Sequence, residues 1–175
     1  MKRKFFVLTV AALVALTAAP AVPAAAAEWE SGLAASPVSS AAPAQAGSSA
    51  QAYQDETLRL INQQRAAHSL KPLTATAAMN GIAAVRAEES SLLFSHTRPN
   101  GSSPASLFSQ YEISFSSAGE NLAYGYSSPS ALVSAWMLSP EHRSNILNAN
   151  FEYTGIGAYQ SSSGKIYCAQ LFYRP

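Results

Sequence analysis

The chain contains little cysteine and little charge. Among its 175 residues there is one cysteine, Cys168, and only 12% are Asp, Glu, Lys or Arg. A single cysteine excludes an internal disulfide, so a hydrophobic core must hold any folded domain together. Cys168 lies in the apolar run IYCAQLFY, which predicts a buried, unreactive thiol. An intermolecular disulfide or a reactive thiol is the alternative.

Long apolar runs are also scarce, with one exception at the N-terminus. Lys2, Arg3 and Lys4 precede an apolar run over 5–19, and three alanines at 25–27 supply a small-residue cleavage site. This pattern predicts a secretory signal peptide at 1–27, because the run is too short and too weakly flanked for a stable membrane span. We therefore expect a secreted, extracellular mature protein with no membrane span.

Positive charge is not in excess once this leader is removed. The formal net charge is +1, and loss of the three basic leader residues changes it to −2. Such a chain has no electrostatic footprint for nucleic acid or for an anionic membrane surface. Nucleic acid is therefore excluded as an expected partner.

Composition divides the rest of the chain into two parts. Residues 28–52 are rich in Ala, Ser and Pro and show no sustained periodicity, which predicts a flexible linker. Residues 53–175 then form one domain, long enough to bury about two thirds of its unfolded surface. We expect this domain to be a monomer.

Helix patterns come first in this domain, and strand patterns follow. Apolar residues at helical spacing predict helices over 53–70, 75–93 and 128–138, and a second Ser-Pro start predicts a short helix over 139–147. Segments 152–160 and 165–173 are rich in β-branched and aromatic residues, and another strand is expected within 113–125. This order predicts an α+β domain with helices on an antiparallel sheet.

Only three histidines are present, and they have different contexts. His68 lies near the end of the first helix, where the helix dipole favours it and no further role is needed. His96, in FSHTRPNG, is either a polar residue bonded to the following turn or a ligand at the rim of a cleft. His142 lies in the first turn of a helix, where the dipole favours neutral imidazole, the form that binds metals or accepts protons.

Glu120, in AGENLAYG, is a carboxylate among apolar neighbours. Its burial is costly unless it is paired, and the candidates are a salt bridge to Arg98 or Arg143, or contact with one or two histidines. Two histidines and a carboxylate also form a ligand set of catalytic zinc centres. However, no local metal-ligand spacing such as H-E-x-x-H is present.

Five motifs occur together in a recognisable order: LINQQRAAHSLKPL, FSHTRPNG, GENLAYG, AWMLSPEHRSNIL and YTGIGAY. In this order they resemble the CAP superfamily, or SCP domain, of cysteine-rich secretory proteins, antigen 5 and pathogenesis-related proteins. The resemblance is to its bacterial, disulfide-free branch and covers about 53–172. It implies a three-layer α-β-α sandwich with a central antiparallel sheet and a large open cleft.

In that family two histidines and two glutamates line the cleft. By motif, the resemblance places three of the four at His96, Glu120 and His142, and it implies a possible site for zinc or another divalent cation at the same residues.

The fourth member does not match, because Ser139 stands at the position of the second glutamate. Ser139 itself, Glu141 and Glu89 are therefore candidates for an accessory role.

The sequence alone determines neither the function nor the identity of any catalytic residue. The resemblance implies a binding module for a lipid or sterol, a cell-envelope component or a protein. The alternative is an extracellular hydrolase of peptide or cell-envelope material, in which histidine and glutamate, with or without a metal, activate water. A third interpretation is a buried polar network that only holds the loops.

Overall fold

A computed structural model describes residues 5–7 and 44–175 of the chain, and its side chains from 49 onward. The helices are α1 (Ala44–Ala67), α2 (Ala77–Leu92), α3 (Ala105–Gln110), α4 (Pro129–Leu138) and α5 (Pro140–Ile146). The strands are β1 (Phe5–Val7), β2 (Thr74–Ala75), β3 (Ser117–Tyr124), β4 (Tyr153–Gln160) and β5 (Ile166–Arg174). Apart from β1, the predicted signal peptide lies outside the described residues. Within those residues no helix is long and apolar enough to cross a membrane.

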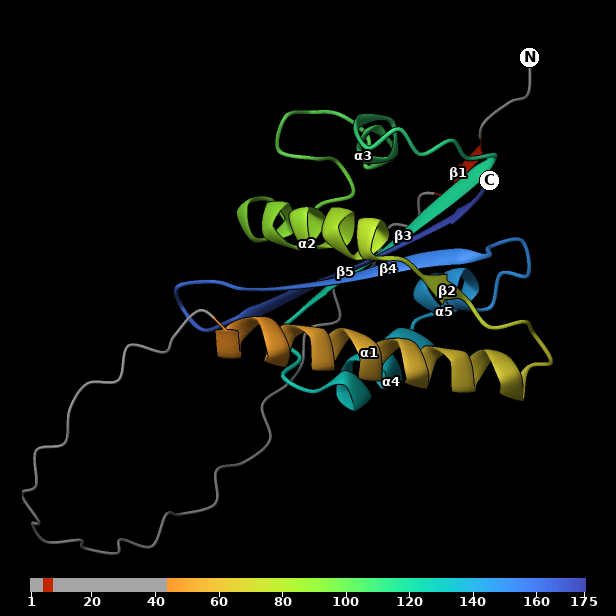
Figure 1. Ribbon diagram of the computed structural model, residues 1–175, viewed down its shortest axis with the longest axis horizontal. Helices are drawn as coiled ribbons and strands as arrows, with labels where there is room; N and C mark the ends of the chain where they lie inside the picture. The colour runs from red at the N-terminus through yellow and green to blue at the C-terminus, as the bar shows by residue number, and fades with distance from the viewer. Residues whose placement is uncertain (1–4, 8–43) are drawn as a thin grey trace, which may run out of the picture.

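The sheet has the strand order β1-β3-β5-β4-β2. Its three long strands, β3, β5 and β4, pair antiparallel, whereas the short edge strands β1 and β2 pair parallel with β3 and β4. Helices α2 and α3 cover one face, and α1, α4 and α5 cover the other (Figure 1). The predicted α-β-α sandwich is confirmed.

The start of α1 differs from the predicted boundary. The helix begins at Ala44, so residues 44–52 of the predicted flexible linker are helical, and the rest of that linker lies outside the described residues. This part reads AQAGSSAQA, and alanine and glutamine are good helix formers even without an apolar stripe. A segment with a composition typical of linkers therefore forms the first part of α1, and the later part of the helix is held by the domain.

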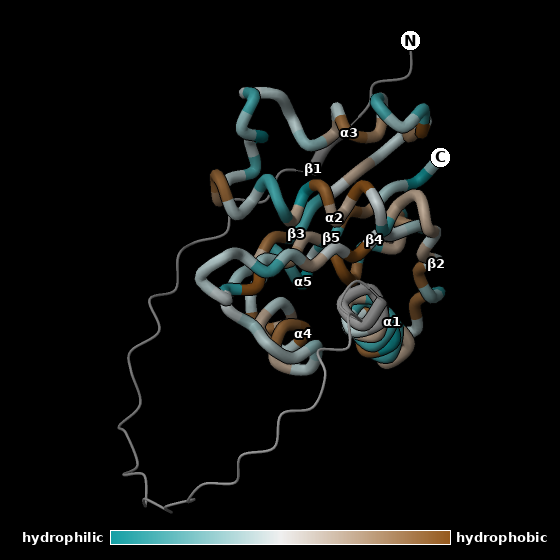
Figure 2. The backbone as a smooth tube through the Cα atoms, turned by 60° about the vertical axis from the view of Figure 1, so that its left-hand side comes forward, coloured by the Kyte–Doolittle hydropathy of each residue, from teal (hydrophilic) through white to brown (hydrophobic). Residues whose placement is uncertain are grey.

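Each face of the sheet has its own hydrophobic core. On one side, Ile61, Leu132 and Trp136 pack with Cys168 and Phe172. On the other side the cluster comprises Met79, Ile82, Ala83, Leu107, Phe108, Phe115, Ala118 and Leu171. Hydrophobic residues recur along α4 and where α2 meets the sheet (Figure 2). Cys168 is free and buried, as predicted, and burial raises the pKa of its thiol to about 11.

Two glycines in YTGIGAY let α2 rest directly on β4. A Cβ at Gly155 would lie 2.1 Å from the carbonyl oxygen of Met79, and one at Gly157 would lie 2.1 Å from the backbone of Ala83. Backbone cannot move aside as a flexible side chain can, so any side chain here would lift the helix. The glycines thus fix the position of α2 and of the loop that follows it.

We predict that Gly157→Ala destabilises the domain by about 1–3 kcal/mol, the usual cost of overpacking a tight contact. Urea unfolding followed by circular dichroism measures this. The matched control is Gly81→Ala within α2, where an added Cβ meets nothing within 4 Å. Because alanine is the better helix former, the control should gain up to about 1 kcal/mol. Equal effects of both variants would contradict the close-approach explanation.

Candidate functional site

Two neighbouring residues of β3 hold the two candidate histidines. Successive side chains of a strand point to opposite faces, so Glu120 faces α2 and Asn121 faces α5. A carboxylate oxygen of Glu120 lies 2.7 Å from Nδ1 of His96, in the loop after α2. The Asn121 amide donates to the backbone carbonyl of His142 on α5, at 3.2 Å. The strand therefore contacts the loop that carries His96 through Glu120 and the helix that carries His142 through Asn121.

The charge partner of Glu120 is Arg86 of α2, neither Arg98 nor Arg143. Nε of Arg86 donates to Oε2 of the carboxylate at 2.7 Å, and Nη2 donates to Oε1 at 3.4 Å. Both side chains are buried, at 0% and 1% exposure. Sequence reasoning missed Arg86, although it follows Met79 and Ile82 at core-facing helical spacing, where an arginine needs a buried partner.

Glu89, a predicted accessory residue, holds the loop that carries His96. Arg98 donates from Nε to both oxygens of Glu89 at 3.0 Å and from Nη2 to one of them at 2.5 Å. Proximity to Glu89 raises the pKa of Arg98. Arg98 also donates to Ser106, so it ties α2 to the start of α3. The described contacts of Glu89 are with arginines, not with the histidines.

The other two accessory candidates lie at the start of α5. The Ser139 hydroxyl donates to a carboxylate oxygen of Glu141 at 3.2 Å. The charge of Glu141 also acts on His142, whose pKa it tends to raise. The charge of Glu141 therefore influences the protonation of His142, and Ser139 helps to hold the Glu141 carboxylate in place.

His142 is buried, with 8% of its surface exposed. Burial lowers the pKa of its imidazole, and the nearby charge of His96 lowers it further, against a smaller opposing effect of Glu141. The predicted preference for the neutral form is thus supported, but burial rather than the helix dipole is the main cause. Its Nε2 is buried and has no hydrogen-bond partner within the described chain.

Three buried amide side chains form a hydrogen-bond network that links β3 to α5 and β5. Asn145 of α5 donates to the Glu120 carbonyl at 3.0 Å and to the Asn121 side chain at 2.9 Å. Asn121 in turn donates to Gln170 of β5 at 3.4 Å. Sequence reasoning did not single out these amides, although Asn121 and Asn145 stand inside the motifs GENLAYG and HRSNIL.

The contacts of Glu120 limit its use as the predicted metal ligand. Both oxygens of Glu120 already accept hydrogen bonds from Arg86 or His96, so this carboxylate orients His96. Among the described residues, no group of three or more His, Cys, Asp or Glu side chains could hold a metal ion. The donors left at this site are imidazole nitrogens, and a metal there stays a prediction.

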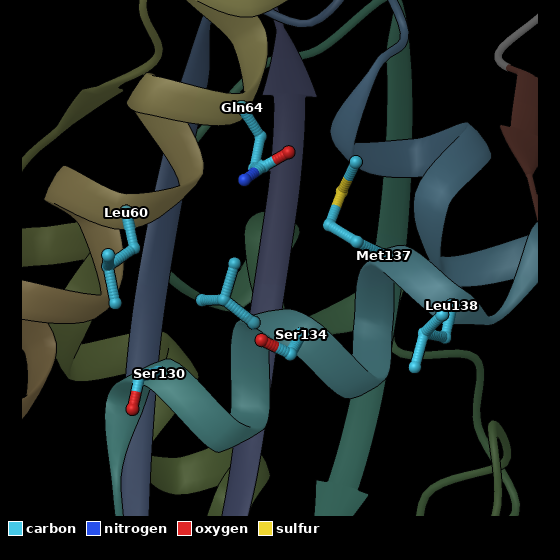
Figure 3. Close-up of a pocket in the computed structure, with 7 residues that line it drawn as sticks. Leu60, Gln64, Ser130, Ser134, Met137 and Leu138 are labelled. Atoms are coloured by element: carbon cyan, nitrogen blue, oxygen red, sulfur yellow. The ribbon is translucent and has the colours of Figure 1, made fainter.

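A hollow of about 360 Å³ lies elsewhere, between α1 and α4 (Figure 3). Its lining is mainly apolar and consists of Leu60, Gln64, Ser130, Val133, Ser134, Met137 and Leu138. None of the predicted site residues His96, Glu120 and His142 lines this groove, and a cleft at those residues stays a prediction.

Residues 58–172 match the model of the CAP family, described as the cysteine-rich secretory protein family. The chain belongs to this family. It is 37% identical over 120 residues to the uncharacterized protein YkwD of Bacillus subtilis, a match that covers 67% of this chain and 47% of that protein. This CAP protein thus spans about half the length of that relative.

Two solved structures share the fold. An extracellular SCP-domain protein from Bacillus anthracis superposes with a TM-score of 0.69 at 24% identity, over 81% of this chain and 45% of the other. An outer surface protein of Borrelia burgdorferi gives a TM-score of 0.58 at 24% identity, over 67% of this chain and 88% of the other. At this identity both support the fold alone.

We predict that His142 makes the CAP domain lose stability in mild acid. Its pKa is lowered from 6.5 in the folded state, so below about pH 6.5 the unfolded chain binds a proton that the folded chain still excludes. The free energy of unfolding should therefore fall from pH 8 to pH 5 more steeply in the wild type than in His142→Gln. Urea unfolding at several pH values measures both slopes, and parallel curves would contradict the prediction.

Proposed function

We propose that this CAP protein acts outside the cell as a binding module whose ligand contacts His96 and His142. The observation that carries this proposal is the unpaired, buried Nε2 of His142. A buried polar atom without a partner costs about 1–3 kcal/mol, and such atoms in folded proteins call for an explanation. A ligand that supplies the missing hydrogen bond recovers this free energy.

A second unpaired atom narrows the chemistry of that ligand. Within the described chain, the buried Nε1 of Trp136 also lacks a hydrogen-bond partner. Its ring lies 6.4 Å from that of His142, centroid to centroid. An indole N–H only donates, whereas a neutral imidazole offers one accepting nitrogen. A hydroxyl group accepts from an indole N–H and donates to an imidazole nitrogen, so a polyhydroxylated ligand such as a cell-envelope glycan offers the hydrogen-bonding chemistry that this pair lacks.

Extracellular action is supported by the predicted leader over 1–27 and by the family. The Bacillus anthracis and Borrelia burgdorferi proteins that share the fold are described as an extracellular and an outer surface protein. A cell-envelope ligand agrees with this location.

The hydrolase alternative is less well supported by the geometry. Glu120 is 1% exposed, and its oxygens are engaged by Arg86 and His96. A general base must come within hydrogen-bond reach of the proton that it removes. Glu120 is placed to orient His96 instead, so only the imidazoles are left for such a role.

We predict saturable binding of muropeptides, prepared by digesting bacterial cell wall, to the full chain. In protein with ¹⁵N-labelled histidine, the ring signals of His96 and His142 should shift together, and chromatography should detect no new product. Affinity should fall at least tenfold in His142→Phe, because the hydrogen bond between the ligand and Nε2 of His142 is lost. The control is His68→Gln, an exposed residue directly after α1, which should bind as the wild type does.

Other outcomes of this titration decide between the alternatives. Histidine-dependent release of a product would establish the hydrolase and overturn the binding module. Absence of any shift at saturating fragment concentration would overturn the glycan ligand. A parallel titration with zinc chloride tests the cation, which two neutral imidazoles could bind and which should require both His96 and His142.

A lipid is a second candidate ligand, favoured by the groove between α1 and α4. Leu60, Val133, Met137 and Leu138 line it, and Leu138 is 85% exposed. Concave surfaces with mainly apolar linings are typical sites for apolar ligands. A single acyl chain would cover these side chains without contact with the histidines.

We predict that a fluorescent fatty acid binds the full chain and that Met137→Gln weakens this binding at least fivefold, because an amide replaces apolar contact surface. His142→Phe should leave it unchanged. Equal loss in both variants would show that the groove and the histidine site are one site, and no binding would remove the lipid from consideration.

A further inference from the structure

We propose that Arg86 is a positioning residue that fixes both the orientation and the tautomer of His96. One guanidinium group reaches the histidine by two routes. It pairs with the Glu120 carboxylate that holds the imidazole, and its Nη2 donates to the backbone carbonyl of Ser95, the residue before His96. The ring and the backbone of His96 are thus held by the same buried side chain.

The shape of the guanidinium makes this double contact possible. Its planar fork offers several N–H donors in fixed directions, whereas a lysine ammonium is a compact charge on a flexible stem. Here Nε and Nη2 are both engaged, and Nη1 lies 3.9 Å from an oxygen of Glu89. With 0% exposure, Arg86 has no water to satisfy these donors, so their directions are set by the protein alone.

The tautomer of His96 follows from the same contacts. A carboxylate paired with a guanidinium only accepts hydrogen bonds, so Nδ1 of His96 must donate its proton to Glu120. Nε2 is then the unprotonated nitrogen of the neutral ring. Carboxylates fix the tautomer of histidines at ligand-binding sites in this way. Without Arg86, the carboxylate loses one of its two anchors and the Ser95 carbonyl loses its donor.

A purely structural role for Arg86 is the competing explanation, and the chain offers a matched control. Arg98 is also buried, at 6% exposure, and also forms a multidentate pair with a glutamate of α2. It holds the same loop, but it contacts Glu89 rather than Glu120. Arg98→Gln therefore breaks a comparable ion pair without contact with the histidine.

The experiment reads the tautomer of His96 in the full chain without ligand, by long-range ¹H–¹⁵N spectra of histidine-labelled protein at pH 8. We expect the wild type and Arg98→Gln to show one tautomer, with the proton on Nδ1. In Arg86→Gln the two ring-nitrogen shifts should move towards each other as both tautomers become populated. Arg86→Lys, which keeps the charge without the fork, should lie between the two.

A single Nδ1–H tautomer in both Arg86 variants would overturn the proposal, as would the same shift change in Arg98→Gln. If Arg86→Gln does not fold, Arg86→Lys decides alone, by the same criterion. The inference rests on the proposed function only in taking His96 as a ligand contact. Because the tautomer is read without ligand, failure of muropeptide binding and failure of the positioning role are separate results.

Discussion

The buried ion pair between Arg86 and Glu120 is the interaction on which the site depends. Each charge, taken from water into the interior, would cost several kcal/mol if left alone, and close pairing through hydrogen bonds offsets this cost. The pair joins α2 to β3, and Glu120 extends it to His96. A charged, polar site is therefore built into a sandwich whose two main cores are apolar.

Alternation along β3 explains how one strand serves both faces. Glu120 and Asn121 are adjacent, yet they belong to networks in different layers, one with α2 and the other with α5. Asn145 joins the two networks, since it bonds to the Glu120 carbonyl and to the Asn121 side chain. The site is thus continuous across the strand, although its histidines come from opposite layers.

Much of this arrangement could be predicted from the sequence, and the exceptions have physical reasons. Hydrophobic periodicity gave the helices and the long strands, and the Ser128 cap is present, accepting from the Ala131 amide. Periodicity could not reveal that residues 44–52 extend α1, because a run of small residues carries no apolar stripe. The helix α3 was not predicted, because its six residues are too few to show a helical periodicity.

For the site, the motifs identified Glu120 and the histidines, and the contact between His96 and Glu120 agrees with that prediction. The predicted salt-bridge partner of Glu120 was wrong, because the arginine that reaches this carboxylate depends on which face of α2 meets the sheet. Gly155 and Gly157 allow that face of α2 to lie directly on β4. The depressed pKa of His142 was expected from a helix terminus, whereas burial, which local sequence does not show, is its main cause.

The placement of His96 and His142 on opposite layers has a thermodynamic consequence. A ligand that touches both can bind only when both helical layers are docked on the sheet. It therefore binds the native state and not a partly folded state in which one layer has detached. By mass action, a ligand at a hundred times its dissociation constant would add about 2.7 kcal/mol to the stability of the whole sandwich. Acting outside the cell as proposed, and without an internal disulfide, the domain would then be most resistant to unfolding where its ligand is abundant.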